Sequence, residues 1–232
     1  MRNGNDLSGK RVLLTGSSGR LGKRLNKRLK RLGAQVIPFD IQTGHDLLCV
    51  EDIQACAAGC DYTIHAAGLA HPGLGSASDY LWNNIVGSVL LAEEASRLRH
   101  DRLVFVSSGA VYGWDAGVPM PDEPMLESNP SALGTADPYT CSKRMAEHAL
   151  YLLSRETTMK IVVLRLAPIW EDDQAPSAAY YYSAVAPDNA VNAIVGSLHM
   201  TCDDAYTVLN IADRLRHGRM DIQRALAAGL IV

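Results

Sequence analysis

Short apolar runs alternate along the chain with longer stretches in which apolar residues recur at helical spacing. The short runs, rich in Val, Ile and Leu, predict strands at Arg11–Thr15, Gln35–Phe39, Tyr62–Ala66, Leu103–Ser107 and Ile161–Leu166. The longer stretches predict helices at Leu21–Leu32, Val50–Ala58, Asp79–Arg99 and Pro138–Arg155, with a weaker one at Asn189–His199. Since parallel strands need crossover helices, this alternation predicts an α/β fold with a doubly wound parallel sheet.

The length of 232 residues suits one such domain with a substantial core. The alternation weakens beyond residue 167, where Tyr180–Tyr182 interrupts it, so we expect a main domain over 1–167 and a small appendage over 168–232, integrated with it. The segment Gly113–Ala136 holds four prolines among Gly, Asp and Ser, which favours an ordered loop that serves a site over an interdomain linker.

Composition excludes several classes of protein. A hydrophobic content of 47% is too high for a disordered chain, and a net charge of −3 supplies no basic field for nucleic acid or anionic lipid. The basic run from Lys23 to Arg31 falls on one predicted helix and is interpreted as a solvated face. No apolar stretch approaches the ~18 residues that span a bilayer, so we expect no membrane segment and a cytoplasmic protein.

The five cysteines form no C-x-x-C pair and are odd in number. A disulfide framework is therefore not expected. Cys56 and Cys60 lie one helical turn apart without companion ligands, so we expect no metal site.

A glycine-rich turn, T-G-S-S-G-R-L-G over Thr15–Gly22, lies between the first predicted strand and the first predicted helix. Glycines there let backbone N–H groups approach a pyrophosphate at a helix N-terminus, although glycine pairs also close ordinary turns. Asp40 ends the next strand, where a carboxylate accepts hydrogen bonds from ribose hydroxyls and repels a 2′-phosphate, unless it only caps a turn. This favours NAD over NADP, a preference that Arg20 near the phosphates would partly offset.

Tyr139 and Lys143 lie four residues apart on the helix that is predicted to start at Pro138, so they share one face. A phenol with a pKa of about 10 is a poor base at neutral pH, but an adjacent ammonium favours its phenolate. Tyr139 would then take a hydroxyl proton from a substrate. On its own, Y-x-x-x-K also fits an ordinary surface pair.

Together these motifs resemble the short-chain dehydrogenase/reductase superfamily, over about residues 11–170. Three later segments resemble its extended branch, the nucleotide-sugar epimerases and dehydratases. They are H-A-A-G at His65–Gly68, N-N-I-V-G-S at Asn83–Ser88 beside the branch's N-V-x-G-T, and S-S-G-A-V-Y-G at Ser107–Gly113 beside S-S-x-x-V-Y-G. The resemblance implies a Rossmann-type sheet that binds NAD, and a substrate-binding role for the appendage.

The resemblance also implies residue roles. Ser108 hydrogen-bonds the reacting oxygen while Ser107 is structural, and Tyr139 is the acid/base. Lys143 holds the nicotinamide ribose and supports the Tyr139 phenolate, and Asp46 and Leu47 match the pair that contacts adenine. Asn83 is the expected cofactor-side contact, with Asn84 as an alternative that equally caps a turn. The full cofactor set is Gly16, Ser18, Gly19, Arg20, Leu21, Gly22, Asp40, Asp46, Leu47, Ala66, Ala67, Gly68, Asn83, Tyr139 and Lys143.

The chain departs from the branch in two places. The branch carries R-x-F-N after the sixth strand, whereas this chain has R-L-A-P over Arg165–Pro168, and proline offers no donor to a substrate. Only residues 171–232 follow Trp170, which is short for a lobe that closes over a nucleotide diphosphate. The segment Ala186–Val191 looks like a degraded H-V-D-D-V-A, which normally starts the next helix, and Tyr180–Tyr182 would line the pocket or pack as core or interface.

These observations predict hydride transfer at a secondary alcohol or ketone of a small carbohydrate-like substrate. Net oxidation or reduction, as in uronate-type dehydrogenases, and internal return of hydride, as in epimerases, both stay open. A regulator that senses NAD without turnover is the alternative from another class, although it need not keep Ser108, Tyr139 and Lys143.

The helices Asp79–Arg99 and Pro138–Arg155 resemble the pair that forms the family's four-helix dimer interface, so a homodimer is expected. Apolar residues on these helices would supply the contacts, unless they face the sheet instead. They are Leu90, Leu91, Met145, Ala149, Leu152 and Leu153.

Overall fold

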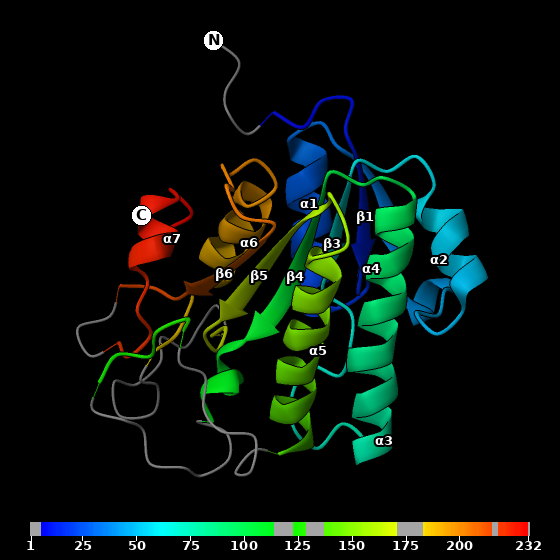
Figure 1. The fold of residues 1–232 in the computed structure, drawn as a ribbon. Helices are drawn as coiled ribbons and strands as arrows, with labels where there is room; N and C mark the ends of the chain where they lie inside the picture. Colours follow the sequence, from blue (N-terminus) through cyan, green and yellow to red (C-terminus); the bar gives the residue numbers. More distant parts are fainter. Residues whose placement is uncertain (1–5, 114–122, 129–136, 171–182, 215–217, 232) are drawn as a thin grey trace.

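The computed structural model describes residues 6–113, 123–128, 137–170, 183–214 and 218–231. A parallel sheet of six strands, in the order β2-β1-β3-β4-β5-β6, runs through the molecule (Figure 1). The α/β prediction of a doubly wound parallel sheet is confirmed. The strands are β1 (Arg11–Thr15), β2 (Gln35–Phe39), β3 (Tyr62–His65), β4 (Arg102–Ser108), β5 (Lys160–Leu166) and β6 (Tyr206–Ile211).

Helices cover both faces of this sheet (Figure 1). They are α1 (Arg20–Arg31), α2 (Val50–Ala57), α3 (Ala77–Tyr80), α4 (Gly87–Arg97), α5 (Pro138–Ser154), α6 (Pro187–Gly196) and α7 (Gln223–Ala227). A π-helical segment, Leu81–Val86, joins α3 to α4, so the helix predicted at Asp79–Arg99 is a continuous rod with one widened stretch. None of the helices in the described parts is long and apolar enough to cross a membrane.

Alternating residues of each strand face the two helical layers, as the pleat of a strand requires. On β4, Val104 packs into the core shared with α1 and α6, whereas Phe105 packs into the core shared with α4 and α5. Because both faces are covered, the central strands are apolar throughout, which is why their sequence signal is strong.

The sixth strand was not among the predicted elements. Tyr206–Ile211 pairs in parallel with β5, and α6 is the crossover helix before it. Its sequence, Y-T-V-L-N-I, interrupts the apolar run with Thr207 and Asn210, both of which are buried. The weakened alternation beyond residue 167 therefore does not mark the end of the sheet.

The loop Gly113–Ala136 is described only at Gly113 and over 123–128. There the backbone of Met125 is hydrogen-bonded to Arg219 and Asp221, so this part of the loop is anchored to the C-terminal segment. Tyr180–Tyr182 lie outside the described residues.

The carboxyl ends of all six strands meet at one edge of the sheet. In doubly wound sheets, ligands bind in the crevice outside this edge. The glycine turn after β1, Asp40 after β2 and the serines that end β4 are all found there.

Candidate active site

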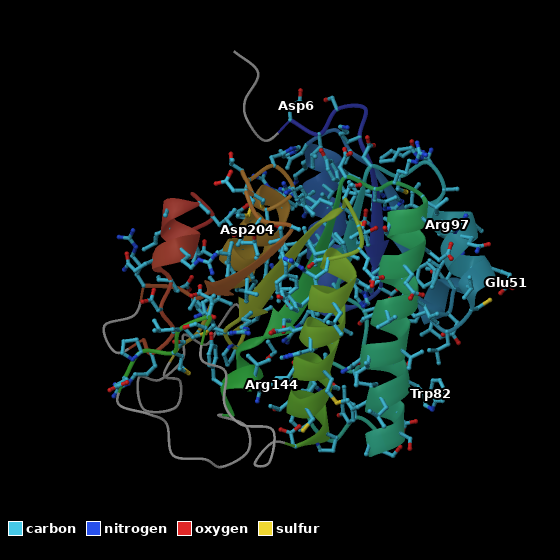
Figure 2. All side chains as sticks on the ribbon, viewed as in Figure 1. Asp6, Glu51, Trp82, Arg97, Arg144 and Asp204 are labelled. Carbon is cyan, nitrogen blue, oxygen red and sulfur yellow. The ribbon has the colours of Figure 1, made fainter. Side chains whose placement is uncertain are left out.

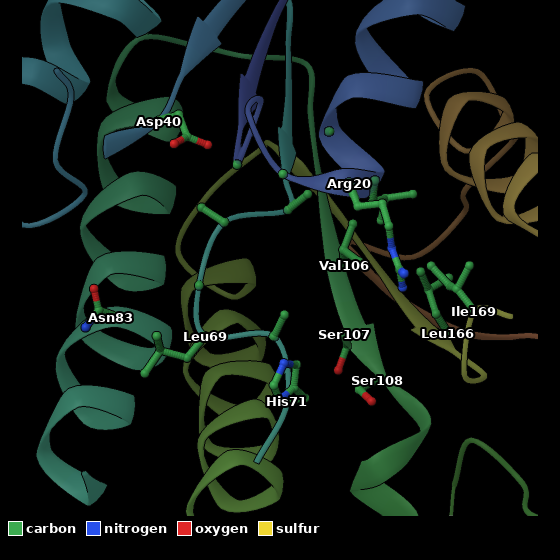
Figure 3. Close-up of a pocket in the computed structure, with 18 of the residues that line it drawn as sticks. Arg20, Asp40, Leu69, His71, Asn83, Val106, Ser107, Ser108, Leu166 and Ile169 are labelled. Atoms are coloured by element: carbon green, nitrogen blue, oxygen red, sulfur yellow. The ribbon is translucent and has the colours of Figure 1, made fainter. Parts of the chain in front are cut away.

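A cleft of about 1110 Å³ opens at this edge of the sheet. Every residue predicted for the cofactor or for catalysis lines the cleft, except Ser18. Figure 3 shows Arg20 and Asp40 near one end of the view and Ser107 and Ser108 near the other. The sequence motifs, far apart along the chain, are thus brought to a single cavity.

The glycine turn has no room for side chains. Gly16 has a φ of +68°, and a Cβ there would lie 2.7 Å from the backbone of Ala66. A Cβ on Gly22 would overlap the carbonyl oxygen of Gly16. Gly19 begins α1 without a capping side chain, and the first turn of α1 holds no acidic residue. The free N–H groups and positive end of α1 therefore fit the diphosphate of a dinucleotide.

Asp40 caps a turn and also belongs to the lining of the cleft. Its Oδ2 accepts the Ser18 N–H at 2.9 Å and its Oδ1 accepts the Gln42 N–H at 3.0 Å, so it caps the 3₁₀ turn Ile41–Thr43. It also lines the cleft. A carboxylate offers about four acceptor sites, which leaves capacity for ribose hydroxyls. Ser18 itself takes part through this backbone contact and is half-buried.

Asp46 and Leu47 lie beside Asp40 in the cleft lining. The Asp46 carboxylate accepts the Leu48 N–H at 2.9 Å, and the Leu47 side chain packs close to Gly87 of α4. These contacts fix the turn that would face an adenine.

A directed chain of hydrogen bonds fixes the ends of β1 and β3. Because the Asn84 carbonyl can only accept, Ser88 Oγ donates to it and must accept from His65 Nε2, 2.8 Å away. His65 Nδ1 then accepts from Thr15 Oγ1 at 2.7 Å, and Thr15 Oγ1 accepts the Ala67 N–H at 3.2 Å. Burial lowers the pKa of His65 to about 3, so this ring stays neutral. The chain holds Ala66–Gly68 in place along the cleft.

The two adjacent asparagines have different surroundings. Asn83 is half-buried on the cleft wall and donates to a backbone carbonyl one turn earlier. Asn84 is buried, and its amide bonds both the N–H and the carbonyl of Leu69 and also Ser142 Oγ, at 2.8, 3.1 and 2.9 Å. The signal was in the sequence, because Asn84 precedes Gly87 by the spacing of N-V-x-G-T. The assignment of Asn83 to the cofactor stays a prediction.

Helix α5, which carries Tyr139 and Lys143, begins at a strong cap. The Asp137 carboxylate accepts the N–H groups of Tyr139 and Thr140, and Pro138 occupies the first helical position. Tyr139, only 6% exposed, packs edge-on against Tyr80 with 6.3 Å between ring centroids. The phenol is therefore held in one place at the cleft.

Lys143 lies one turn further along and is 7% exposed. Its Nζ donates to the Val106 carbonyl at 3.1 Å and lies 5.0 Å from the centroid of the Phe105 ring. Burial lowers the pKa of the Lys143 ammonium to about 8, while the carboxylate of Glu147 acts in the opposite direction. Both Lys143 and Tyr139 line the same cleft as the glycine turn.

The two serines at the end of β4 differ in their partners. Ser107 Oγ donates to Glu147 Oε1 at 2.5 Å and is buried. Ser108 Oγ accepts the Ala110 N–H at 3.1 Å and is only partly buried, so its hydroxyl hydrogen is available to the cleft (Figure 3). This geometry suits a structural role for Ser107, while the role of Ser108 as the substrate contact stays a prediction.

The wall after β5 is apolar where the extended branch carries asparagine. Pro168 and Trp170 line the cleft, and Trp170 Nε1 donates to Asp213 Oδ2 at 3.4 Å. The segment Ala186–Val191 starts α6 at Pro187, as its likeness to the branch led us to expect. Among the described residues, no cluster of three or more His, Cys, Asp or Glu side chains suits a metal ion.

Comparisons with known proteins agree with this geometry. Residues 12–170 match the NAD dependent epimerase/dehydratase family. A UDP-glucose 4-epimerase of Neisseria gonorrhoeae is 31% identical over 147 residues, which cover 60% of this chain and 40% of the relative. One from Yersinia enterocolitica is 37% identical over 92 residues, covering 39% and 26%. The chain thus spans about a quarter to two fifths of these curated relatives.

Solved structures resemble the chain over nearly its whole length. Glucuronic acid dehydrogenase from Chromohalobacter salexigens superimposes with a TM-score of 0.77 at 19% identity, covering 96% of this chain and 84% of that one. MoeE5 in complex with UDP-glucuronic acid and NAD gives 0.78 at 19% identity, covering 94% and 92%. At these identities the likeness shows the fold.

Proposed function

Since the chain belongs to the NAD-dependent epimerase/dehydratase family, enzymes of the short-chain dehydrogenase/reductase type, we propose that it transfers hydride at a secondary alcohol or ketone of a carbohydrate-like substrate. The observation that carries the proposal is the position of Tyr139 and Lys143. Both are buried and line the same cleft as the glycine turn.

The residues present fit NAD, the cofactor of this family. Backbone N–H groups between Gly16 and Gly22 would hold the diphosphate, Asp40 the adenosine ribose and Lys143 the nicotinamide ribose. When bound, NAD supplies the hydride acceptor or donor. Because Asp40 would repel a 2′-phosphate, NADP is the less favoured cofactor.

The side chains of the cleft handle the proton. As a substrate hydroxyl becomes a carbonyl, Tyr139 takes the hydroxyl proton, and Ser108 donates a hydrogen bond to the reacting oxygen. The ammonium of Lys143 stabilises the Tyr139 phenolate electrostatically. In the reverse direction, Tyr139 returns the proton to the oxygen.

Hydride transfer has two outcomes, and different observations favour each of them. Pro168, in place of the asparagine that grips a nucleotide sugar, favours net oxidation or reduction of a smaller substrate such as a sugar acid. The similarity to UDP-glucose 4-epimerases favours internal return of hydride. An NAD-sensing regulator is disfavoured because Ser108, Tyr139 and Lys143 are all retained in the cleft.

The test is an absorbance screen for NADH formation with free sugars, uronates and nucleotide sugars, using NAD and NADP, together with an epimerisation assay on the nucleotide sugars. We expect Tyr139→Phe to abolish turnover, whereas Tyr151→Phe, on the exposed side of the same helix, should retain it. Equal activity of wild type and Tyr139→Phe would refute Tyr139 as the acid/base, and tight NADH binding without turnover of any substrate would support the regulator.

A homodimer is proposed from the exposed apolar side chains of the helices. Trp82 projects outward from the rod formed by α3 and α4 (Figure 2), and Met145 and Leu152 are exposed on α5. Leu91 and Leu153, also expected at the interface, pack toward the sheet instead. Light scattering at micromolar concentration should give a dimer mass that Leu152→Glu reduces, and a monomeric wild type would contradict the proposal.

A cytoplasmic site of action is also proposed. None of the five cysteines, all of which lie in the described parts of the chain, forms a disulfide bond, as is usual where thiols are kept reduced. Fractionation of cells that produce the protein should recover it with cytoplasmic markers.

A further inference from the structure

His71 is a titratable side chain of the cleft that the proposed chemistry does not use. It lines the cavity together with Ser108 and Tyr139, and it is exposed. Figure 3 shows its ring on the wall that continues from Leu69, facing the side on which Ser107 and Ser108 lie. His71 therefore borders the part of the cleft where proton transfer is proposed.

The segment that carries His71 is fixed at both ends. At its start, the Asn84 amide bonds both backbone groups of Leu69. At its end, a capping box between Ser76 and Asp79 begins α3. A backbone tied down on both sides presents its side chain in a defined position, which is what a binding site needs.

Tyr80 connects this segment to the catalytic tyrosine. Its hydroxyl donates to the His71 carbonyl at 2.7 Å and accepts the Leu74 N–H at 3.0 Å, and its side chain is 2% exposed. The same ring packs edge-on against Tyr139. One buried side chain thus positions both His71 and Tyr139, which places them at the same end of the cleft.

One ring nitrogen of His71 already makes a hydrogen bond within the protein. Nδ1 lies 2.9 Å from the Pro72 carbonyl oxygen, and a carbonyl can only accept, so Nδ1 carries the hydrogen. In neutral imidazole the other nitrogen, Nε2, then has its lone pair available. The tautomer held by Pro72 makes His71 a hydrogen-bond acceptor.

We propose that His71 is a substrate-contacting residue, whose Nε2 accepts a hydrogen bond from a hydroxyl of the carbohydrate-like substrate next to the reacting carbon. The inference rests on the proposed function and adds a specificity-determining residue to it. In this arrangement Ser108 and Tyr139 bind the reacting oxygen, and His71 binds a neighbouring hydroxyl from the opposite wall of the cleft. A substrate that lacks this hydroxyl would leave Nε2 unpaired in the complex.

The experiment compares three variants with the wild type, each loaded with NADH. His71→Leu removes the acceptor, His71→Gln replaces it with an amide oxygen, and His148→Leu makes the same change at an exposed histidine of α5 outside the cleft. Binding of glucuronate, UDP-glucose and UDP-glucuronic acid is measured by saturation-transfer NMR, and NADH affinity by fluorescence. We expect His71→Leu to weaken binding of the accepted sugar by roughly 3- to 10-fold, the effect of losing one neutral hydrogen bond.

His71→Gln should recover most of that loss, while His148→Leu and all NADH affinities stay at the wild-type value. Equal sugar binding by the wild type and His71→Leu would overturn the role of His71 and leave the proposed function intact. A parallel loss of NADH affinity in His71→Leu would also overturn it, because the residue would then shape the cofactor end. If the wild type binds none of the three sugars, the proposed carbohydrate function fails, and this inference fails with it.

Discussion

The carboxylate of Glu147 on α5 is paired with the guanidinium of Arg165 on β5, with 2.7 Å between Oε2 and Nη2, and both side chains are buried. Ser107 donates to the same carboxylate, and Arg165 Nη1 donates to the Tyr112 hydroxyl at 3.0 Å. Burial, the largest single influence, lowers the pKa of Arg165, but the hydrogen bonds and charge of Glu147 and the contact with Tyr112 together outweigh it and raise that pKa. The pair therefore joins the catalytic helix to the strands that form the floor of the cleft.

Breaking this pair should destabilise the protein strongly. Arg165→Met leaves the Glu147 carboxylate buried without its partner, and we expect a loss of about 3–5 kcal/mol in unfolding free energy. Arg97→Met, which breaks the more exposed pair with Glu94 on α4, should cost much less, because solvent screens that pair. Urea denaturation measures both. Equal losses of unfolding free energy in the two variants would mean that the buried pair contributes no more to stability than the exposed pair.

Replacing both members of the buried pair by apolar residues should recover part of the loss. The double variant Glu147→Met with Arg165→Met leaves no unpaired buried charge, so it should be more stable than Arg165→Met alone. A double variant that is less stable than Arg165→Met would contradict this expectation. It would indicate that losing the hydrogen bonds from Ser107 and Tyr112 to the charged pair costs more stability than removing the unpaired charge restores.

The glycine turn should tolerate no side chain at position 22. Because a Cβ there overlaps the Gly16 carbonyl oxygen, Gly22→Ala must displace backbone. We expect a loss of roughly 1–3 kcal/mol in stability and at least a tenfold loss of NADH affinity by fluorescence titration. Gly73→Ala, where a φ of +84° strains the residue but no atom lies within 4 Å of a Cβ, should lose some stability and keep NADH affinity. Unchanged NADH binding by Gly22→Ala would place the diphosphate elsewhere.

Asp40 should set the preference for NAD. Asp40→Asn keeps one oxygen that can accept the Ser18 N–H, gives up the acceptor of the Gln42 N–H, and removes the charge that repels a 2′-phosphate. The ratio of NADPH to NADH affinity should rise by about tenfold or more, measured by fluorescence titration of both nucleotides. Asp46→Asn, beside it in the cleft, serves as the control and should change the ratio little. An unchanged ratio in Asp40→Asn would show that Asp40 acts only as a turn cap.

Sequence patterns predicted the elements whose signals are local. The strands of the sheet centre are buried on both faces, so their apolar runs stand out, and β6 was missed because it carries buried polar residues. Asn210, the clearest case, is paired with Tyr112 and with backbone carbonyls of Met125 and Asp221. Tyr112 and Met125 are distant from Asn210 in sequence. The sequence around a buried asparagine therefore resembles that of a loop, and its place in a strand becomes clear only from the fold.

The candidate site divides in the same way. The glycine turn and the Tyr139–Lys143 pair are defined by short spacings within one stretch of the chain, so they could be recognised from the sequence. Glu147 and His71 gain their significance from partners on other elements, or from a cleft whose lining residues are spread along the chain from Gly16 to Pro187. No spacing within the sequence predicts such contacts.

The buried ammonium of Lys143 should make stability depend on pH in a predictable direction. Burial lowers its pKa from 10.5 to about 8 in the folded protein. Between these two values the unfolded chain holds a proton that the folded protein has released, so the unfolding free energy rises with pH across this window. Below about pH 8 both states are protonated, and the folded protein carries the full cost of burying the charge.

Lys143→Met isolates this contribution, because it removes the titrating group and keeps an apolar side chain of similar length. The difference in unfolding free energy, wild type minus Lys143→Met, should grow by roughly 2–3 kcal/mol between pH 7.5 and 10.5. Urea titrations at several pH values measure it, and other titrating groups cancel in the difference. A difference that is flat or falls with pH would show that burial does not destabilise the Lys143 ammonium.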